Sequence, residues 1–78
     1  MQAMRYFFVI VKPNGSAVED NDGVECPTLV DAVGLGRSMA FDLAVEDRQY
    51  IGGAVIVRDA RGQQVDRVAI RQRDAIKW

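Results

Sequence analysis

The chain has 78 residues, of which 49% are hydrophobic and 27% are charged, with a formal net charge of −1 and one cysteine. This composition indicates a single folded domain over residues 1–78 and excludes both a disordered chain and a disulfide framework. No segment approaches the roughly 20 apolar residues of a membrane span, so we expect a cytoplasmic protein with no membrane partner.

The first predicted element is a strand over residues 5–12, because RYFFVIVK is rich in aromatic and β-branched residues. Both alternating faces of this strand are apolar, which indicates a central strand or one covered by a partner. Turn residues follow at 13–16 and 20–23, where Gly23 suits a positive φ. Residues 17–19 are a candidate short extended segment, and a short strand at 24–26 is expected to pair back to the first strand as a hairpin with a long loop. Residues 1–3 are expected to fray, and either Met1 or Met4 could be the native start.

A long helix is predicted from Thr28 to about Glu46. Thr28 can act as the N-cap, with Asp31 in the first turn, and Pro27 disfavours an earlier start. Three small residues spaced by four form a smooth strip that would let a sheet or another helix approach closely, and Gly34 suggests a local irregularity. The strip comprises Ala32, Gly36 and Ala40. The apolar face expected to be buried comprises Leu29, Val33, Gly36, Ala40 and Leu43.

A second hairpin is predicted after the helix. Strands are expected at 54–58 and 63–70, joined by a tight turn over 59–62 with Gly62 in the left-handed region. Residues 74–78 are expected to form a flexible tail. The predicted fold class is therefore α+β with the order ββαββ, in which one long helix packs on an antiparallel sheet of about four strands.

The order of these motifs resembles a family of short bacterial domains of unknown function. The resemblance rests on the RYFF-like opening at 5–8, the Asp22-Gly23 turn, the V-E-x-P entry at 24–27 and the closing Asp-x-x-Gly turn at 59–62. This sequence departs from the family pattern at the helix, where glycines replace alanines, and in a longer loop at 12–20. The resemblance implies a small α+β domain. It implies no activity and no functional residues.

Apolar residues extend beyond one face of the helix, which predicts a partner, most simply a second copy of the chain. The candidate interface comprises Val30, Leu35 and Phe41 of the helix and Phe7 and Val9 of the first strand. The alternative is that the two hairpins cover these residues within one chain.

The charge is uneven along the chain. Residues 1–57 hold four Lys/Arg and eight Asp/Glu, whereas residues 58–78 hold six Lys/Arg and three Asp/Glu. Basic residues near the C-terminus could contact phosphates, with a tryptophan stacked on a base. This set comprises Arg67, Arg71, Arg73, Lys77 and Trp78. The alternative is a solvated face with ion pairs, because Asp59, Asp66 and Asp74 interleave, so nucleic acid is an unlikely partner.

The remaining motifs predict little chemistry. Histidine is absent, which excludes His-dependent triads and the commonest zinc ligand. The stretch at 20–23 lacks the flanking acids of a calcium loop and is expected to be a plain turn. Cys26 precedes a helix N-terminus, which could activate a thiol, but a single cysteine is more often a small buried hydrophobe. We expect no enzyme, cofactor or metal site.

The sequence thus predicts a non-enzymatic protein-interaction module that forms a homodimer and could bind another, unidentified protein. The runner-up is a nucleic-acid-binding accessory protein that uses the basic C-terminal hairpin and tail.

Overall fold

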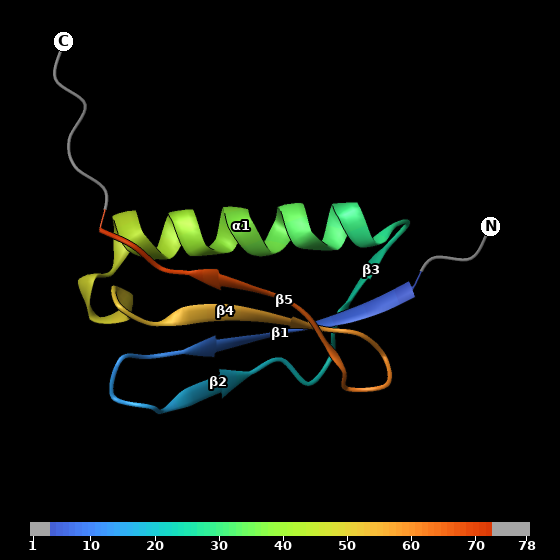
Figure 1. Ribbon diagram of the computed structural model, residues 1–78, viewed down its shortest axis with the longest axis horizontal. Helices are drawn as coiled ribbons and strands as arrows, with labels where there is room; N and C mark the ends of the chain where they lie inside the picture. Colours follow the sequence, from blue (N-terminus) through green and yellow to red (C-terminus); the bar gives the residue numbers. More distant parts are fainter. Residues whose placement is uncertain (1–3, 73–78) are drawn as a thin grey trace, which may run out of the picture.

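The computed structural model describes residues 4–72 and confirms the predicted α+β class (Figure 1). One long helix packs on an antiparallel sheet of five strands. In chain order the elements are β1 (Met4–Val11), β2 (Ala17–Glu19), β3 (Val24–Cys26), α1 (Leu29–Glu46), a short 3-10 helix η1 (Arg48–Tyr50), β4 (Ala54–Arg58) and β5 (Gln64–Ala69).

The sheet is built around β1. Its order is β2-β1-β4-β5, and β3 pairs with β1 as well. Along β1, pairing with β2 ends at Val9, and pairing with β3 begins at Tyr6. The returning arm of the first hairpin is therefore split into two short strands. The turn at residues 20–23 interrupts the pairing opposite Phe7 and Phe8, which gives five strands instead of about four. Gly23 and Gly62 have φ of +75° and +82°, as predicted for their turns.

The boundaries of α1 follow the capping residues. Thr28 has an extended backbone, and its Oγ1 accepts a hydrogen bond from the Asp31 N–H at 3.2 Å. At the other end, the Asp47 N–H donates to the Leu43 carbonyl at 2.9 Å. The helix continues without interruption through Gly34, so the irregularity suggested by the sequence is absent from this segment.

Small residues allow α1 to lie close to the sheet. A line of four residues faces the strands and is buried: Ala32, Gly36, Ala40 and Ala44. A Cβ at Gly36 would lie 2.8 Å from Cγ2 of Val57. From the sheet, Tyr6, Phe8, Cys26, Val55, Val57 and Ile70 complete the core. Leu29 was expected in this core but is 46% exposed. As the first residue of α1, it lies at the edge of the contact with the sheet.

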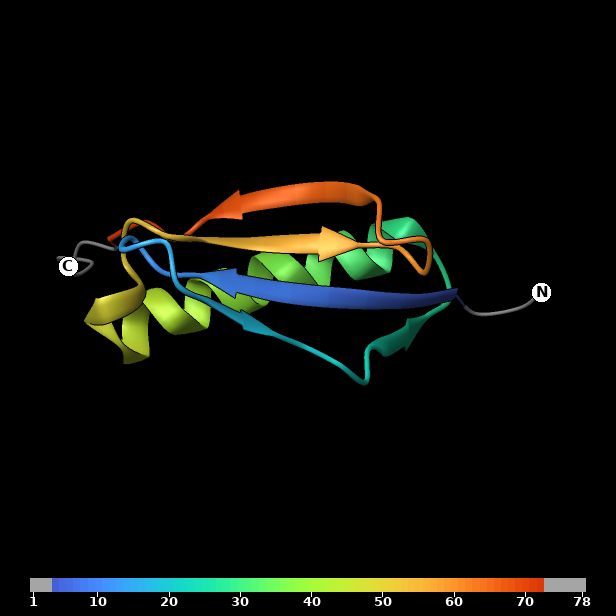
Figure 2. The ribbon, with the colours of Figure 1, turned by 90° about the horizontal axis from the view of Figure 1, so that it is seen from below.

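The helix covers one face of the sheet only. Seen from below, β1, β4 and β5 lie in front of α1, and no helix or strand among residues 4–72 crosses the other face (Figure 2). We call this second face the open face. Residues of β1 alternate between the two faces, so Tyr6 and Phe8 pack toward α1 while Phe7 and Val9 belong to the open face.

Candidate interaction surfaces

The five residues predicted to form an interface lie on three separate surfaces. Val30 and Phe41 share one flank of α1. Leu35 lies about 120° around the helix axis from Phe41, on the other flank. Phe7 and Val9 lie on the open face of the sheet, on the far side from α1. The structure therefore brings together Val30 and Phe41 but not the whole set.

A stripe of apolar residues runs along one flank of α1, and we call it the α1 flank: Val30, Gly34, Phe41 and Val45. Val30 is 79% exposed, Phe41 is 47% exposed and Val45 is 62% exposed. These side chains fall within about 60° of one another around the helix axis. The prediction from the sequence did not include Val45, although it follows Phe41 by four residues, the spacing that places two side chains on one helical face.

The two glycines inside α1 have different surroundings. A Cβ at Gly36 would meet Val57 and Phe8, so the fold itself requires a small residue there. Among residues 4–72, a Cβ at Gly34 would meet nothing within 4 Å. A glycine in a helix interior costs about 1 kcal/mol relative to alanine. Packing within this part of the chain therefore explains Gly36 and does not explain Gly34.

The open face exposes little apolar surface, although no element lies over it among residues 4–72. Val9 is 5% exposed and Ile56, its partner on β4, is 8% exposed. An ion pair helps to cover them, because Arg58 Nη1 lies 3.7 Å from Glu19 Oε1. Arg58 pairs with Phe7 on one side of β1 and Glu19 pairs with Val9 on the other, so this ion pair spans the strand. Phe7 and Val9 are consequently weaker interface candidates than the α1 flank.

A shallow groove lies on the open face, with a volume of about 200 Å³. Phe7 and Val9 line it, together with residues of the 20–23 turn and the β4–β5 turn. In the two turns, Asp20 Oδ1 and Asp59 Oδ1 each accept two backbone N–H bonds. Pockets for small molecules are usually about 300–1,000 Å³. The groove is therefore smaller than the usual pocket for a small molecule.

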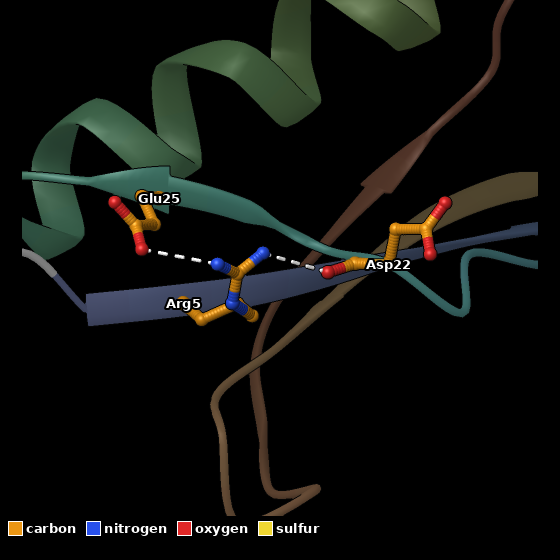
Figure 3. Close-up of polar contacts among 3 residues, drawn as sticks. All are labelled: Arg5, Asp22 and Glu25. Atoms are coloured by element: carbon orange, nitrogen blue, oxygen red, sulfur yellow. Dashed lines mark hydrogen bonds and ion pairs between the residues drawn. The ribbon is translucent and has the colours of Figure 1, made fainter.

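Arg5 holds the irregular turn against β1 (Figure 3). Its Nη1 donates to the Asp22 carbonyl at 2.8 Å and its Nη2 to Glu25 Oε1 at 3.0 Å. Asp20 Oδ1 accepts the Asp22 and Gly23 N–H groups within this turn. The Asp20 carboxylate thus stabilises a turn. Across residues 4–72, no three His, Cys, Asp or Glu side chains gather as a metal ion would require.

The structure describes two of the five residues predicted to contact nucleic acid, Arg67 and Arg71. Arg67 is exposed and pairs with Ile56, and Arg71 is exposed just beyond β5. Arg73, Lys77 and Trp78 lie outside the described residues. Arg58, the other cation of this hairpin's strands, is engaged with Glu19.

Cys26 belongs to the core rather than to a reactive site. It is 4% exposed and forms part of the cluster between sheet and helix. Burial raises the pKa of its thiol, and the negative charge of Asp31 raises it further. Both effects favour the neutral thiol over the nucleophilic thiolate. Burial and the nearby negative charge therefore oppose activation of the Cys26 thiol by the helix N-terminus.

Comparison with known proteins identifies the family of this chain. No curated protein and no solved structure is significantly similar to this chain. Within residues 4–72, no helix is long and apolar enough to cross a membrane. The model of one family matches residues 5–71, which is most of the chain and includes the helix and nearly all of every strand. The chain therefore belongs to the family described as Domain of unknown function (DUF6894).

Proposed function

We propose that this chain is a non-enzymatic protein-interaction module that acts as a homodimer, and that two copies join through the α1 flank. The observation that carries the proposal is the exposure of Val30, Phe41 and Val45 on one side of a single helix. Scattered exposed hydrophobic residues are normal in soluble proteins, but three that line up along one flank of a helix favour a partner.

The size of the surface suggests a weak dimer. An 18-residue helix is about 27 Å long and about 10–12 Å wide with its side chains. One flank is thus smaller than the roughly 800 Å² per partner of a standard interface. We therefore expect a dissociation constant in the micromolar range, unless residues beside the flank join the contact.

The apolar faces of β1 give no support to a dimer. Both faces are apolar because β1 is the central strand, with α1 over one face and the Glu19–Arg58 ion pair helping to cover the other. The proposed interface therefore lies on the helix alone, and Phe7, Val9 and Leu35 are left out of it.

A non-enzymatic role is part of the proposal. Its supports are the small volume of the groove, the raised pKa of the Cys26 thiol and the use of Asp20 and Asp59 in backbone turns. Catalysis by acid–base or nucleophilic groups needs several such groups aimed at one point. We also propose a bacterial, cytoplasmic protein. Fractionation of cells that produce the chain would test its location.

The test is the molecular mass in solution between about 1 and 100 µM, by light scattering after gel filtration and by native mass spectrometry. We expect a dimer that dissociates on dilution and that Phe41→Glu abolishes. Leu35→Glu is the matched control, because it places the same charge on the other flank of α1. A thermal melt of each variant separates loss of the dimer from loss of the fold.

Two results would overturn the proposal: a monomer at every concentration, or a dimer that Leu35→Glu disrupts and Phe41→Glu does not. A co-purifying oligonucleotide, with retention on heparin that falls steeply with salt, would instead favour binding to nucleic acid.

A further inference from the structure

The α1 flank is symmetric about its own midpoint. This midpoint lies between Arg37 and Ser38, near the middle of a helix that spans Leu29–Glu46. Val30 lies as many residues before the midpoint as Val45 lies after it. Gly34 and Phe41 are related in the same way. A flank with this pattern is complementary to a second copy of itself that runs in the opposite direction.

An antiparallel pair of α1 helices around a two-fold axis at this midpoint brings unlike residues together. Val30 of each copy then lies level with Val45 of the other. The exposed part of the Phe41 ring of each copy lies level with Gly34 of the other, and both point close to the centre of the seam. An isologous interface of this kind requires that each contact occurs twice, which this arrangement satisfies.

The geometry points to a homodimer in which Phe41 of each copy packs into the space over Gly34 of the other. This inference rests on the proposed function and specifies its interface. It also explains Gly34, which weakens the helix and has none of the other described residues within 4 Å of where its Cβ would lie. A side chain at Gly34 would be tolerated by the chain alone and would fill the space that Phe41 of the second copy needs.

The charge of Arg37, near the two-fold axis, predicts how the dimer responds to salt. Arg37 of the two copies would lie on the same side of the seam, so their repulsion disfavours the dimer at low ionic strength. Salt screens such a repulsion between exposed charges. The dimer should therefore be at least as tight in moderate salt as in low salt, in contrast to a complex with nucleic acid.

The first test is Gly34→Ala, which should act in opposite directions on two measurements. Alanine should raise the stability of the dilute, monomeric chain, because it favours the helix. It should weaken the dimer roughly tenfold, because a methyl group occupies the space for Phe41. Asp42→Ala is the control, since it strengthens the helix away from the flank and should leave the dissociation constant unchanged.

The second test determines the direction of the helices. Val30→Cys and Val45→Cys are made separately in a Cys26→Ala background, mixed, allowed to exchange and treated with a short bis-maleimide. We expect the mixed product, in which one Val30→Cys chain is joined to one Val45→Cys chain. Val18→Cys on β2, where Val18 is 50% exposed, measures random cross-linking.

The outcomes separate this inference from the proposed function. A monomer at every concentration overturns both. A dimer that cross-links Val30→Cys to itself, or that gives no product above the Val18→Cys background, overturns only the antiparallel arrangement. A dimer whose dissociation constant is unchanged by Gly34→Ala also overturns it, because Phe41 cannot then lie over Gly34.

Discussion

Replacing Gly36 with alanine should destabilise the fold, although alanine is the better helix former. The Cβ would lie 2.8 Å from Cγ2 of Val57 and 3.7 Å from Cε2 of Phe8. Val57 is fully buried, and a β-branched side chain has little freedom to turn away. The strand or the helix must therefore move to admit the new methyl group.

The magnitude follows from two opposing effects. Alanine gains about 1 kcal/mol over glycine in a helix interior. Adding a methyl group to a well-packed core costs about 1–3 kcal/mol. We expect Gly36→Ala to lose about 0–2 kcal/mol of unfolding free energy, which corresponds to a fall in melting temperature of up to about 16 °C for a domain of this size.

Gly34→Ala provides the matched control, since it makes the same change two residues away, where a Cβ meets nothing of residues 4–72 within 4 Å. The difference between the two variants removes the helix-propensity gain and leaves the packing cost of about 1–3 kcal/mol. Urea denaturation followed by circular dichroism, at dilution where the chain is monomeric, measures both. Equal stabilities for the two variants would refute the close approach of α1 to β4 at Gly36.

Three further predictions test the elements around the core. Thr28→Ala should lower the unfolding free energy by about 1 kcal/mol in the same urea assay, because the Asp31 N–H loses the Oγ1 acceptor that caps α1; an unchanged midpoint would remove Thr28 as a cap. Gly53→Ala should cost several kcal/mol or prevent folding, because the new Cβ would collide with the carbonyl oxygen of Val11; a variant with the normal melting temperature would contradict this backbone contact. Because the pKa of the Cys26 thiol is raised in the folded chain, this thiol ionises at a lower pH in the unfolded chain, so the unfolding free energy should fall as pH rises above about 8.5. Cys26→Ala should reduce this fall, and an identical pH dependence in both proteins would assign the fall to other groups.

Local signals in the sequence determined the elements themselves. The helix begins after Thr28 and ends at Glu46 as expected, because an N-cap, a following acid and a preceding proline act within a few residues of the boundary. Gly23 and Gly62 take positive φ for the same kind of reason, since the turn geometry demands it. The strip of small residues at four-residue spacing predicted the close approach of a sheet or another helix to α1, and the structure shows that it is the sheet.

The tertiary structure decided which of those residues remain available to a partner. The sequence could not reveal that Glu19 and Arg58, far apart in the chain, meet across β1 and help to cover Val9. Helical spacing already put Leu35 and Phe41 on different sides of the helix, but only packing against the sheet defined the buried line that leaves both of them exposed. Secondary structure depends on neighbours in the chain, whereas exposure depends on which distant segments fold over a residue, and that is why the candidate interface emerged only from the fold.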